Sequence, residues 1–357
     1  MNDSIKNTTT TDNPFAECFS LKTVVALNYS LGILMTLFGC IAIVGDCIIC
    51  VVILKRRKFH KLQYAPVFML CLSDLLISTV ALPLEVASYL TYDHSLYIFT
   101  PVETVFQNAI WYALTSLSIM SLALISIEKF ITIYYPFKYI EIITRKTIAG
   151  AITIVWFQGM ATFVGFWYLQ RWPEYGYYDF YVPQWFEKSV LLFNFVIPAL
   201  INFFSYGYIF KMVLQHSRKN ACGNFDHQTQ RNNNDAKTKS DWRENLKIAR
   251  NLKNSRPFTY LVISFCCLWL PFILYQIYLT FDNQFYYSCN GELIDSTLSM
   301  ITFGSCVGNA LIYGIFNKQF RKIFMKAFGM GKSSFVSTYD ASMDTDRRTR
   351  NKETKDF

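Results

Sequence analysis

The chain has 357 residues, of which 52% are hydrophobic and only 17% are charged, and its mean hydropathy is +0.22. Soluble domains carry about 25% charged residues, so this composition argues against a wholly soluble fold and indicates contact with lipid. The net charge is +9, and its placement along the chain is more informative than its size.

Seven apolar stretches are each long enough to cross a bilayer core, which takes about 20 helical residues. Helices are expected because lipid offers no partner for backbone polar groups, and the stretches lack the alternation of membrane strands. The sequence therefore predicts an all-α membrane protein, a seven-transmembrane helix bundle. The predicted spans are Val24–Leu54, Ala65–Leu90, Val105–Ile127, Thr147–Leu169, Ser189–Leu214, Phe258–Phe281 and Leu293–Phe316.

Lys and Arg in the connecting segments predict the orientation. The segments after spans one, three and five are basic, as in "KRRKFHK", whereas the alternate set contains few bases. The N-terminus (1–23) is therefore expected outside and the C-terminus inside, in the plasma membrane. The N-terminal residues lack the features of a signal peptide, so span one is expected to act as an uncleaved anchor. Sequons at Asn2 and Asn7 predict glycosylation there.

Three inner segments follow from composition. Residues 215–256, within the 24–316 membrane domain, are polar and are expected to be largely disordered, with helical extensions at each end. In residues 317–328, "NKQFRKIFMKAF", apolar residues recur at helical spacing and basic residues fill the other face. This pattern predicts an amphipathic helix on the inner leaflet. The tail, 329–357, is expected to be disordered, and its Ser and Thr residues are either simply solvated or substrates for kinases, whose phosphates would recruit a basic partner.

Polar side chains within the spans are costly in lipid and are functional candidates. Those selected are Asp46, Asp74, Ser118, Ser305 and Asn309. A charged pair, Glu128 and Lys129, stands where the third apolar run ends. Prolines at positions 83, 198 and 271 permit kinks, which a bundle that rearranges would need.

Five motifs in chain order resemble the rhodopsin-like family of G-protein-coupled receptors, over roughly Leu27–Phe328. Each motif alone is weak, but all of them in order on the expected helices are specific. They are "LSDLL" with Asp74, the fourth-span Trp156, "FVIPALINFFSYGY" with Pro198 and Tyr206, "FCCLWLP" with Phe265, Trp269 and Pro271, and "NALIY" with Asn309 and Tyr313. The "EKF" triplet departs from the family's acid-Arg-aromatic triplet at the same place.

The departures from the family pattern concern four features. Asp46 stands where the family has Asn, Lys129 where it has Arg, and Ala310 where it has Pro. Thr104 stands where most members have Cys, and no Cys lies between Trp167 and Ser189, so the family's common disulfide is absent.

The resemblance implies a receptor that binds an extracellular ligand and activates a heterotrimeric G protein. It assigns the conformational switch to Trp269, Phe265, Pro271, Tyr206 and Tyr313. It assigns G-protein coupling to Glu128 and Lys129. It also implies a sodium site at Asp74, Ser118, Asn309 and Ser305. Asp46 would add a second carboxylate nearby, which predicts either a bound sodium ion or one protonated acid. Arrestin and receptor kinases are further partners that the resemblance implies.

Alternatives remain open. The "EKF" triplet keeps a receptor that signals through arrestin or scavenges its ligand under consideration. A transporter or channel is disfavoured because no internal repeat is found. Retinal is not expected, because Phe303 stands where opsins have a Lys. Apart from the sodium ion no cofactor is expected, and no catalytic activity or nucleic-acid partner.

The ligand class is not indicated by the sequence. Trp111 occupies the position at which amine receptors of the family have Asp, so a simple amine bound in that manner is disfavoured. Glu85, Glu103 and Asp295 at the pocket mouth would suit a cationic group or a basic peptide, or they simply face water. The expected pocket residues are Trp111, Tyr112, Thr115, Asn194, Phe272, Gln276, Ser299, Glu85 and Asp295.

Two of the ten Cys residues, Cys18 and Cys289, are expected outside the membrane on the outer face. Outside the cell disulfides persist, so these two are predicted to be joined, which would tie the N-terminus to the third outer loop. Free thiols, or bonds to another chain, are the alternatives.

Overall fold

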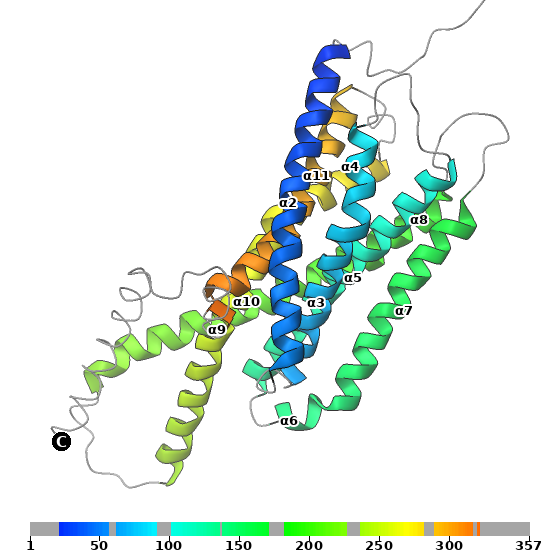
Figure 1. The fold of residues 1–357 in the computed structure, drawn as a ribbon. Coiled ribbons are helices and arrows are strands. Elements are labelled where there is room, and N and C mark those ends of the chain that lie inside the picture. Colours follow the sequence, from blue (N-terminus) through cyan, green and yellow to red (C-terminus); the bar gives the residue numbers. More distant parts are fainter. Residues whose placement is uncertain are drawn as a thin grey trace, which may run out of the picture. The chain divides into compact units, whose positions relative to one another are not determined.

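The computed structural model describes residues 21–56, 62–90, 101–135, 138–170, 182–226, 236–281, 289–316 and 320–321, and every regular element within these ranges is helical (Figure 1). In chain order the elements are α2 (Leu21–Lys55), η2 (Leu62–Tyr64), α3 (Ala65–Leu76), η3 (Ile77–Ala81), α4 (Leu82–Leu90), α5 (Pro101–Tyr134), α6 (Tyr139–Ile142), α7 (Arg145–Leu169), α8 (Gln184–Val190), η4 (Leu191–Val196), α9 (Ile197–Asp226), α10 (Ala236–Phe281) and α11 (Cys289–Phe316).

Seven helical stretches among the described residues are long and apolar enough to cross a membrane, which confirms the predicted all-helical class with seven spans. The observed helices are longer than the apolar runs that predicted them. The third, for example, begins at Pro101 and ends at Tyr134, whereas the apolar run is Val105–Ile127. The additional turns carry polar residues, which hydropathy alone leaves out of a span.

The bundle within the first of two compact units, Met1–Ile312, is organised around α5. This helix packs against α3, α7, α9 and α10, and it lies beside α7 in Figure 1. In its most apolar window 72% of the residues are buried inside the protein, against 22% for α7. Side chains of α5 are therefore the ones most able to join functional residues from different helices.

Local signals account for where two of the helices begin. The Thr144 hydroxyl accepts a hydrogen bond from the Thr147 backbone N–H at 3.2 Å, so Thr144 is the N-cap of α7. Pro66 stands in the first turn of α3, where its missing N–H would have no intrahelical partner. Both devices fix one end of a span.

Two short π-helical turns interrupt the membrane helices. One, η3, lies between α3 and α4 in the second span, and the other, η4, lies between α8 and α9 in the fifth. A π turn inserts one residue into a helix and changes which side chains face the core. In η4 the result is that Asn194 and Phe195 are both buried.

The segment expected to be largely disordered is helical over much of its length. Helix α9 continues to Asp226 and α10 begins at Ala236, so 215–226 and 236–256 are helix, in the places where helical extensions were expected. The stretch "AKTKSDWRENLKIAR" is rich in Ala, Lys, Arg, Glu and Leu, which favour helix even when polar.

The second compact unit is Tyr313–Phe357. Within it the Tyr313 ring packs edge-on against Phe320, with ring centroids 5.9 Å apart. The amphipathic helix expected at 317–328 lies outside the described residues except for 320–321, which are helical. The tail 329–357 and the N-terminal residues Asn2, Asn7 and Cys18 also lie outside them, so the predictions made for these positions stay predictions.

Candidate functional site

A buried polar cluster joins three helices in the middle of the bundle. The Ser118 hydroxyl on α5 donates to Asp74 Oδ1 at 2.6 Å, and the Asn309 amide on α11 donates to Asp74 Oδ2 at 2.8 Å. Asp74, on α3, is fully buried. The sequence singled out these three side chains separately, and the structure brings them into direct contact.

A cavity of about 10 Å³ lies beside this cluster. A volume of this size holds about one water molecule or one small ion. Ser118, Ser305 and Asn309 provide its polar wall, and Trp269 and Phe265 belong to its apolar wall. The lining residues are Leu70, Ser118, Ile119, Leu122, Phe265, Trp269, Ser305 and Asn309.

Asp46 on α2 is fully buried, and among the described residues no nitrogen or oxygen donor pairs with its carboxylate, beside which lies the weak thiol donor of Cys71. It lies within electrostatic range of Asp74, and the Cys71 thiol is its neighbour on α3. The structure thus brings Asp46 near the cluster without joining it to the hydrogen-bonded core. A buried carboxylate with only a weak donor is unfavourable, so a nearby cation or protonation would stabilise Asp46.

The donor set suits a sodium ion. Hard cations take oxygen ligands, and here a carboxylate, two hydroxyls and an amide carbonyl surround or adjoin a cavity of ionic size. Asp74, Ser118, Ser305 and Asn309 would hold the ion, which would neutralise the carboxylate charge in the membrane. Asp46 would add to the negative potential that attracts it.

Aromatic rings surround Trp269 on α10. Its ring centroid lies 6.4 Å from that of Phe265, 6.1 Å from that of Phe272 and 5.9 Å from that of Phe195 on η4. Trp269 also lines the polar cavity, so it contacts both the cavity and the rings of Phe195 and Phe272. Pro271, two residues along, is exposed on the outside of the bundle.

The outer half holds a continuous set of ring contacts among the expected pocket residues. Trp111 meets Tyr112 at 4.9 Å and Phe272 at 5.7 Å between centroids, and Tyr112 stacks on Phe166 at 4.6 Å. Because Phe272 also meets Trp269, ring contacts connect Trp111 to the cavity wall. The Thr115 hydroxyl is used within α5, donating to the Trp111 carbonyl at 2.6 Å.

The remaining pocket candidates are held in separate pairs. Gln107 donates to Glu85 at 2.7 Å, and Gln276 donates to Asp295 at 3.2 Å. Asn194 donates to the Thr162 hydroxyl at 2.8 Å. Ser299 is half-buried on α11, and Glu103 is exposed at the start of α5. The structure therefore does not bring the outer acids together into one set.

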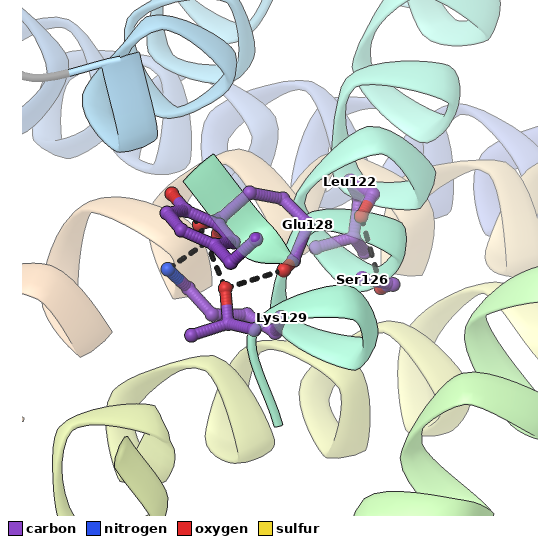
Figure 2. A network of polar contacts seen from close by, with 6 residues as sticks. Leu122, Ser126, Glu128 and Lys129 are labelled. Atoms are coloured by element: carbon purple, nitrogen blue, oxygen red, sulfur yellow. Dashed lines mark hydrogen bonds and ion pairs between the residues drawn. The ribbon is translucent and has the colours of Figure 1, made fainter. Parts of the chain in front are cut away.

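The inner end of α5 carries the charged pair (Figure 2). Lys129 Nζ lies 2.5 Å from Glu128 Oε2, with side-chain exposures of 8% and 3%. Glu128 Oε1 also accepts from the Tyr139 hydroxyl of α6 at 2.9 Å and from the Thr132 hydroxyl at 3.2 Å. A carboxylate that accepts from three donors is well satisfied, so this arrangement keeps the Lys129 ammonium inside the protein.

Tyr139 stays a donor across the neutral range. Burial and the adjacent Glu128 carboxylate raise the pKa of its hydroxyl above the ordinary value. The protonated hydroxyl is favoured in the folded protein, so its contribution to stability is complete at neutral pH. That contribution falls only as the pH rises from the unfolded-state pKa through the raised folded-state value.

Tyr206, expected to act in the switch, is buried on α9, and its hydroxyl lies near Ser126 without a hydrogen bond of ordinary geometry. Tyr313, expected to act with it, belongs to the second compact unit. The predicted bond between Cys18 and Cys289 lies outside the described residues, although Cys289 begins α11.

Several partners were missed by the sequence analysis. Tyr139, Thr132 and Gln107 reach their acids from a neighbouring turn or element, and nothing in their local sequence marks them. Asn202 could have been found, because it is a polar residue within a span and meets the criterion that selected Asp46. It is fully buried on α9 and accepts a hydrogen bond from Ser126 on α5.

Curated relatives align with most of the chain at low identity. The mouse G-protein coupled receptor 161 is 24% identical over 310 residues, which cover 81% of this chain and 55% of that protein. The mouse neuromedin-U receptor 2 is 24% identical over 84% of this chain and 75% of its own length. The octopamine receptor beta-2R of Chilo suppressalis is 26% identical over 92% and 86%. The chain thus spans little more than half the length of the first of these relatives.

The family model described as "7 transmembrane receptor (rhodopsin family)" matches residues 45–313. This range contains the whole Asp74 cluster, the rings around Trp269 and the Glu128–Lys129 pair. It covers well over half of the chain and extends from the first span to the last. The chain therefore belongs to the rhodopsin family of G-protein-coupled receptors.

Proposed function

We propose that the protein is a plasma-membrane receptor, with its N-terminus outside, that transmits the binding of an extracellular ligand to a heterotrimeric G protein. The observation that carries the proposal is the family match over residues 45–313. The basic inner segments support the orientation.

The ring contacts supply a route from ligand to helix movement. A ligand that displaces Trp111 or Phe272 changes the packing of Trp269, because Phe272 touches both. Trp269 in turn packs on Phe265, one turn further toward the inner end of α10. Closely packed rings do not deform continuously, so a shift at one end is passed on as a rearrangement that lets α10 move.

The polar cluster stabilises the closed arrangement. Asp74 ties α3 to α5 and α11 through two hydrogen bonds, and a sodium ion at this cluster would reinforce them. Movement of the helices would separate these groups, so ion binding and activation oppose each other.

At the inner end the closed arrangement hides the coupling residue. Lys129 is held by Glu128, which Tyr139 and Thr132 fix in place. Opening of the bundle would free the ammonium to face the G protein. Family members use Arg here, whose planar fork makes more directed contacts than an ammonium.

The comparisons do not select the ligand. The relatives are similar at nearly equal identity and are named for different ligands, octopamine in one case and neuromedin U in another. The aromatic rings suit a ligand with an aromatic or apolar part. The polar pairs Gln107–Glu85, Gln276–Asp295 and Asn194–Thr162 suit a ligand that also carries hydrogen-bonding groups.

A second candidate is a receptor that recruits arrestin or takes up its ligand without activating a G protein. The observation in its favour is Lys129 at the place of the family's Arg, because Lys makes fewer directed contacts.

The test is a screen of peptides, amines and lipids against the receptor in lipid nanodiscs with purified heterotrimers, read as guanine-nucleotide exchange. At least one ligand should raise exchange with the natural chain and do so less with Lys129→Ala. Arrestin recruitment without exchange would instead establish the second candidate, and ligand-driven ion flux in vesicles without either response would refute both.

A further inference from the structure

A polar contact between α5 and α9 is not used by the proposed function. The Ser126 hydroxyl donates to Asn202 Oδ1 at 2.5 Å, and both side chains are fully buried. Ser126 lies two residues before Glu128 on α5, as Figure 2 shows. The contact therefore ties α9 to the central helix beside the pair proposed to couple to the G protein.

The Ser126 hydroxyl has a single proton and two acceptors within reach. The other acceptor is the Leu122 carbonyl of its own helix, at 3.0 Å (Figure 2). A serine inside a helix ordinarily uses such a carbonyl. In this structure the bond to Asn202 is the shorter one, so the contact between helices competes with a contact that Ser126 could always make alone.

Two hydrogen-bonding groups beside this contact are poorly paired. Among the described residues the Asn202 Nδ2 amide has no partner, and the Tyr206 hydroxyl lies near Ser126 without a hydrogen bond of ordinary geometry. Both side chains are more than nine-tenths buried, and four residues separate them on α9, which places them on one face of the helix. An unpaired buried donor raises the free energy of the conformation that contains it, relative to one that pairs it.

We propose that Asn202 is a positioning residue that sets how readily Tyr206 and the inner half of α9 leave this arrangement. The bond from Ser126 holds α9 in place. The unpaired Nδ2 and the poorly paired Tyr206 hydroxyl act in the opposite direction, because any shift that pairs them fully is favoured. The effect on signalling rests on the proposed function. The balance between the Ser126–Asn202 bond and the poorly paired groups on α9 does not.

Two substitutions separate the opposing effects. Ser126→Ala removes the holding bond and leaves both ends of the Asn202 amide unpaired. The closed arrangement should weaken, and ligand-free nucleotide exchange should rise about fivefold, the effect expected for one buried hydrogen bond. The melting temperature should fall.

Asn202→Leu removes the unpaired amide, keeps a side chain of similar size, and lets Ser126 use the Leu122 carbonyl at 3.0 Å. Replacing a poorly satisfied polar contact by apolar packing is often neutral or stabilising. Ligand-free exchange should therefore fall below that of the natural chain, and the melting temperature should stay equal or rise.

The two variants are compared as full chains in nanodiscs. Two variants are matched controls. Ser121→Ala changes another buried serine of α5, and Phe203→Leu changes the lipid-exposed neighbour of Asn202. Readouts are ligand-free exchange with purified heterotrimers, the melting temperature, and amide hydrogen exchange over residues 198–209. The last two need no G protein.

Ligand-free exchange and melting temperature that shift in opposite directions in Ser126→Ala and Asn202→Leu, with little change in the controls, would support the proposed role of Asn202. Shifts in the same direction, or an equal effect of Ser121→Ala, would overturn it, because a merely structural contact loses stability in both variants. If no form of the receptor supports exchange, the proposed function fails, while melting temperature and hydrogen exchange still decide the role of Asn202.

Discussion

Lys129 is the residue at which this chain departs most from its family in chemistry. Its ammonium lies 2.5 Å from Glu128 and is almost wholly buried, and Tyr139 and Thr132 contact the same carboxylate in the closed state. A compact ammonium on a flexible chain gives less direction than a guanidinium. Coupling to the G protein therefore depends on whether the positive charge of Lys129 is sufficient without the directed contacts of a guanidinium.

Substitution of Lys129 tests that dependence. With a ligand from the screen and matched surface expression, Lys129→Arg should keep or increase maximal nucleotide exchange. Lys129→Ala should lower it about tenfold, the order expected for loss of a hydrogen bond to a charged group. Lys188, an exposed base on α8, gives a control in Lys188→Ala. Full signalling by Lys129→Ala would reduce the pair to charges placed where lipid meets water.

The buried acids predict a sodium effect on stability. In sodium chloride the melting temperature of the purified receptor should exceed that in choline chloride of equal ionic strength by a few degrees, because the ion binds only the folded protein. Asp74→Asn should remove the difference, since Asp74 is the carboxylate that Ser118 and Asn309 hold. Asp46→Asn should reduce it, since it removes the second negative charge.

Ser121→Ala, at a buried position outside the cluster, is the control for this measurement. An equal response to sodium in the natural chain and in Asp74→Asn would exclude the ion from this cluster.

The sequence predicted the components of the polar cluster but not all of their contacts. Asp74, Ser118 and Asn309 were selected because polar side chains are costly in lipid, and that cost is also why they meet. The partners of Glu128 could not be found in this way. Tyr139 is eleven residues away on another helix, and only the turn between α5 and α6 brings its hydroxyl to the carboxylate.

At the scale of helices, hydropathy predicted the number and approximate place of the spans because both depend on the thickness of the bilayer. It did not predict the π turns, which add one residue without changing composition. Nor did it predict the length of α9 and α10 beyond the membrane, because polar helix formers lower hydropathy while favouring helix.

A close approach of two helices supplies a prediction at this scale. A Cβ atom at Gly45 on α2 would lie 2.5 Å from the Cβ atom of Ala310 on α11, which is far inside contact distance. Gly45→Ala should therefore destabilise the receptor by about 1–3 kcal/mol, as overpacking does. Thermal unfolding of the purified protein measures this loss.

The reciprocal change should restore what Gly45→Ala removes. Adding Ala310→Gly returns the space, so the double variant should recover most of the lost stability, beyond the sum of the two single effects. Gly207→Ala on α9 is the matched control, because no atom lies within 4 Å of its added Cβ. Failure of Ala310→Gly to rescue would mean that Gly45 acts through helix flexibility instead of this contact.

For the whole molecule, the open question is what restrains the outer face. Thr104 stands where the family's disulfide would begin, so this chain needs another restraint if its outer loops are to be ordered. Cys18 and Cys289 are the predicted pair, and a disulfide of this kind typically adds about 2–4 kcal/mol.

Mass spectrometry of non-reduced proteolytic peptides would test this bond. One peptide pair containing both Cys18 and Cys289 should appear without reductant and separate after reduction. A Cys18→Ser variant should lose the pair and melt at a lower temperature. Recovery of the two cysteines in separate peptides before reduction would refute the link.

The π turns have a consequence for comparing this receptor with its relatives. Each successive residue is rotated by about 100° around an α-helix. A relative whose second helix is regular would match this chain residue for residue up to Leu76, but beyond η3 (Ile77–Ala81) an ungapped alignment would be out by one position. Glu85 would then be equated with a side chain on a different face, and the same error would follow η4 in the fifth helix. Ligand contacts transferred by numbering alone would be misassigned in the outer half of both helices, so one gap belongs at each π turn.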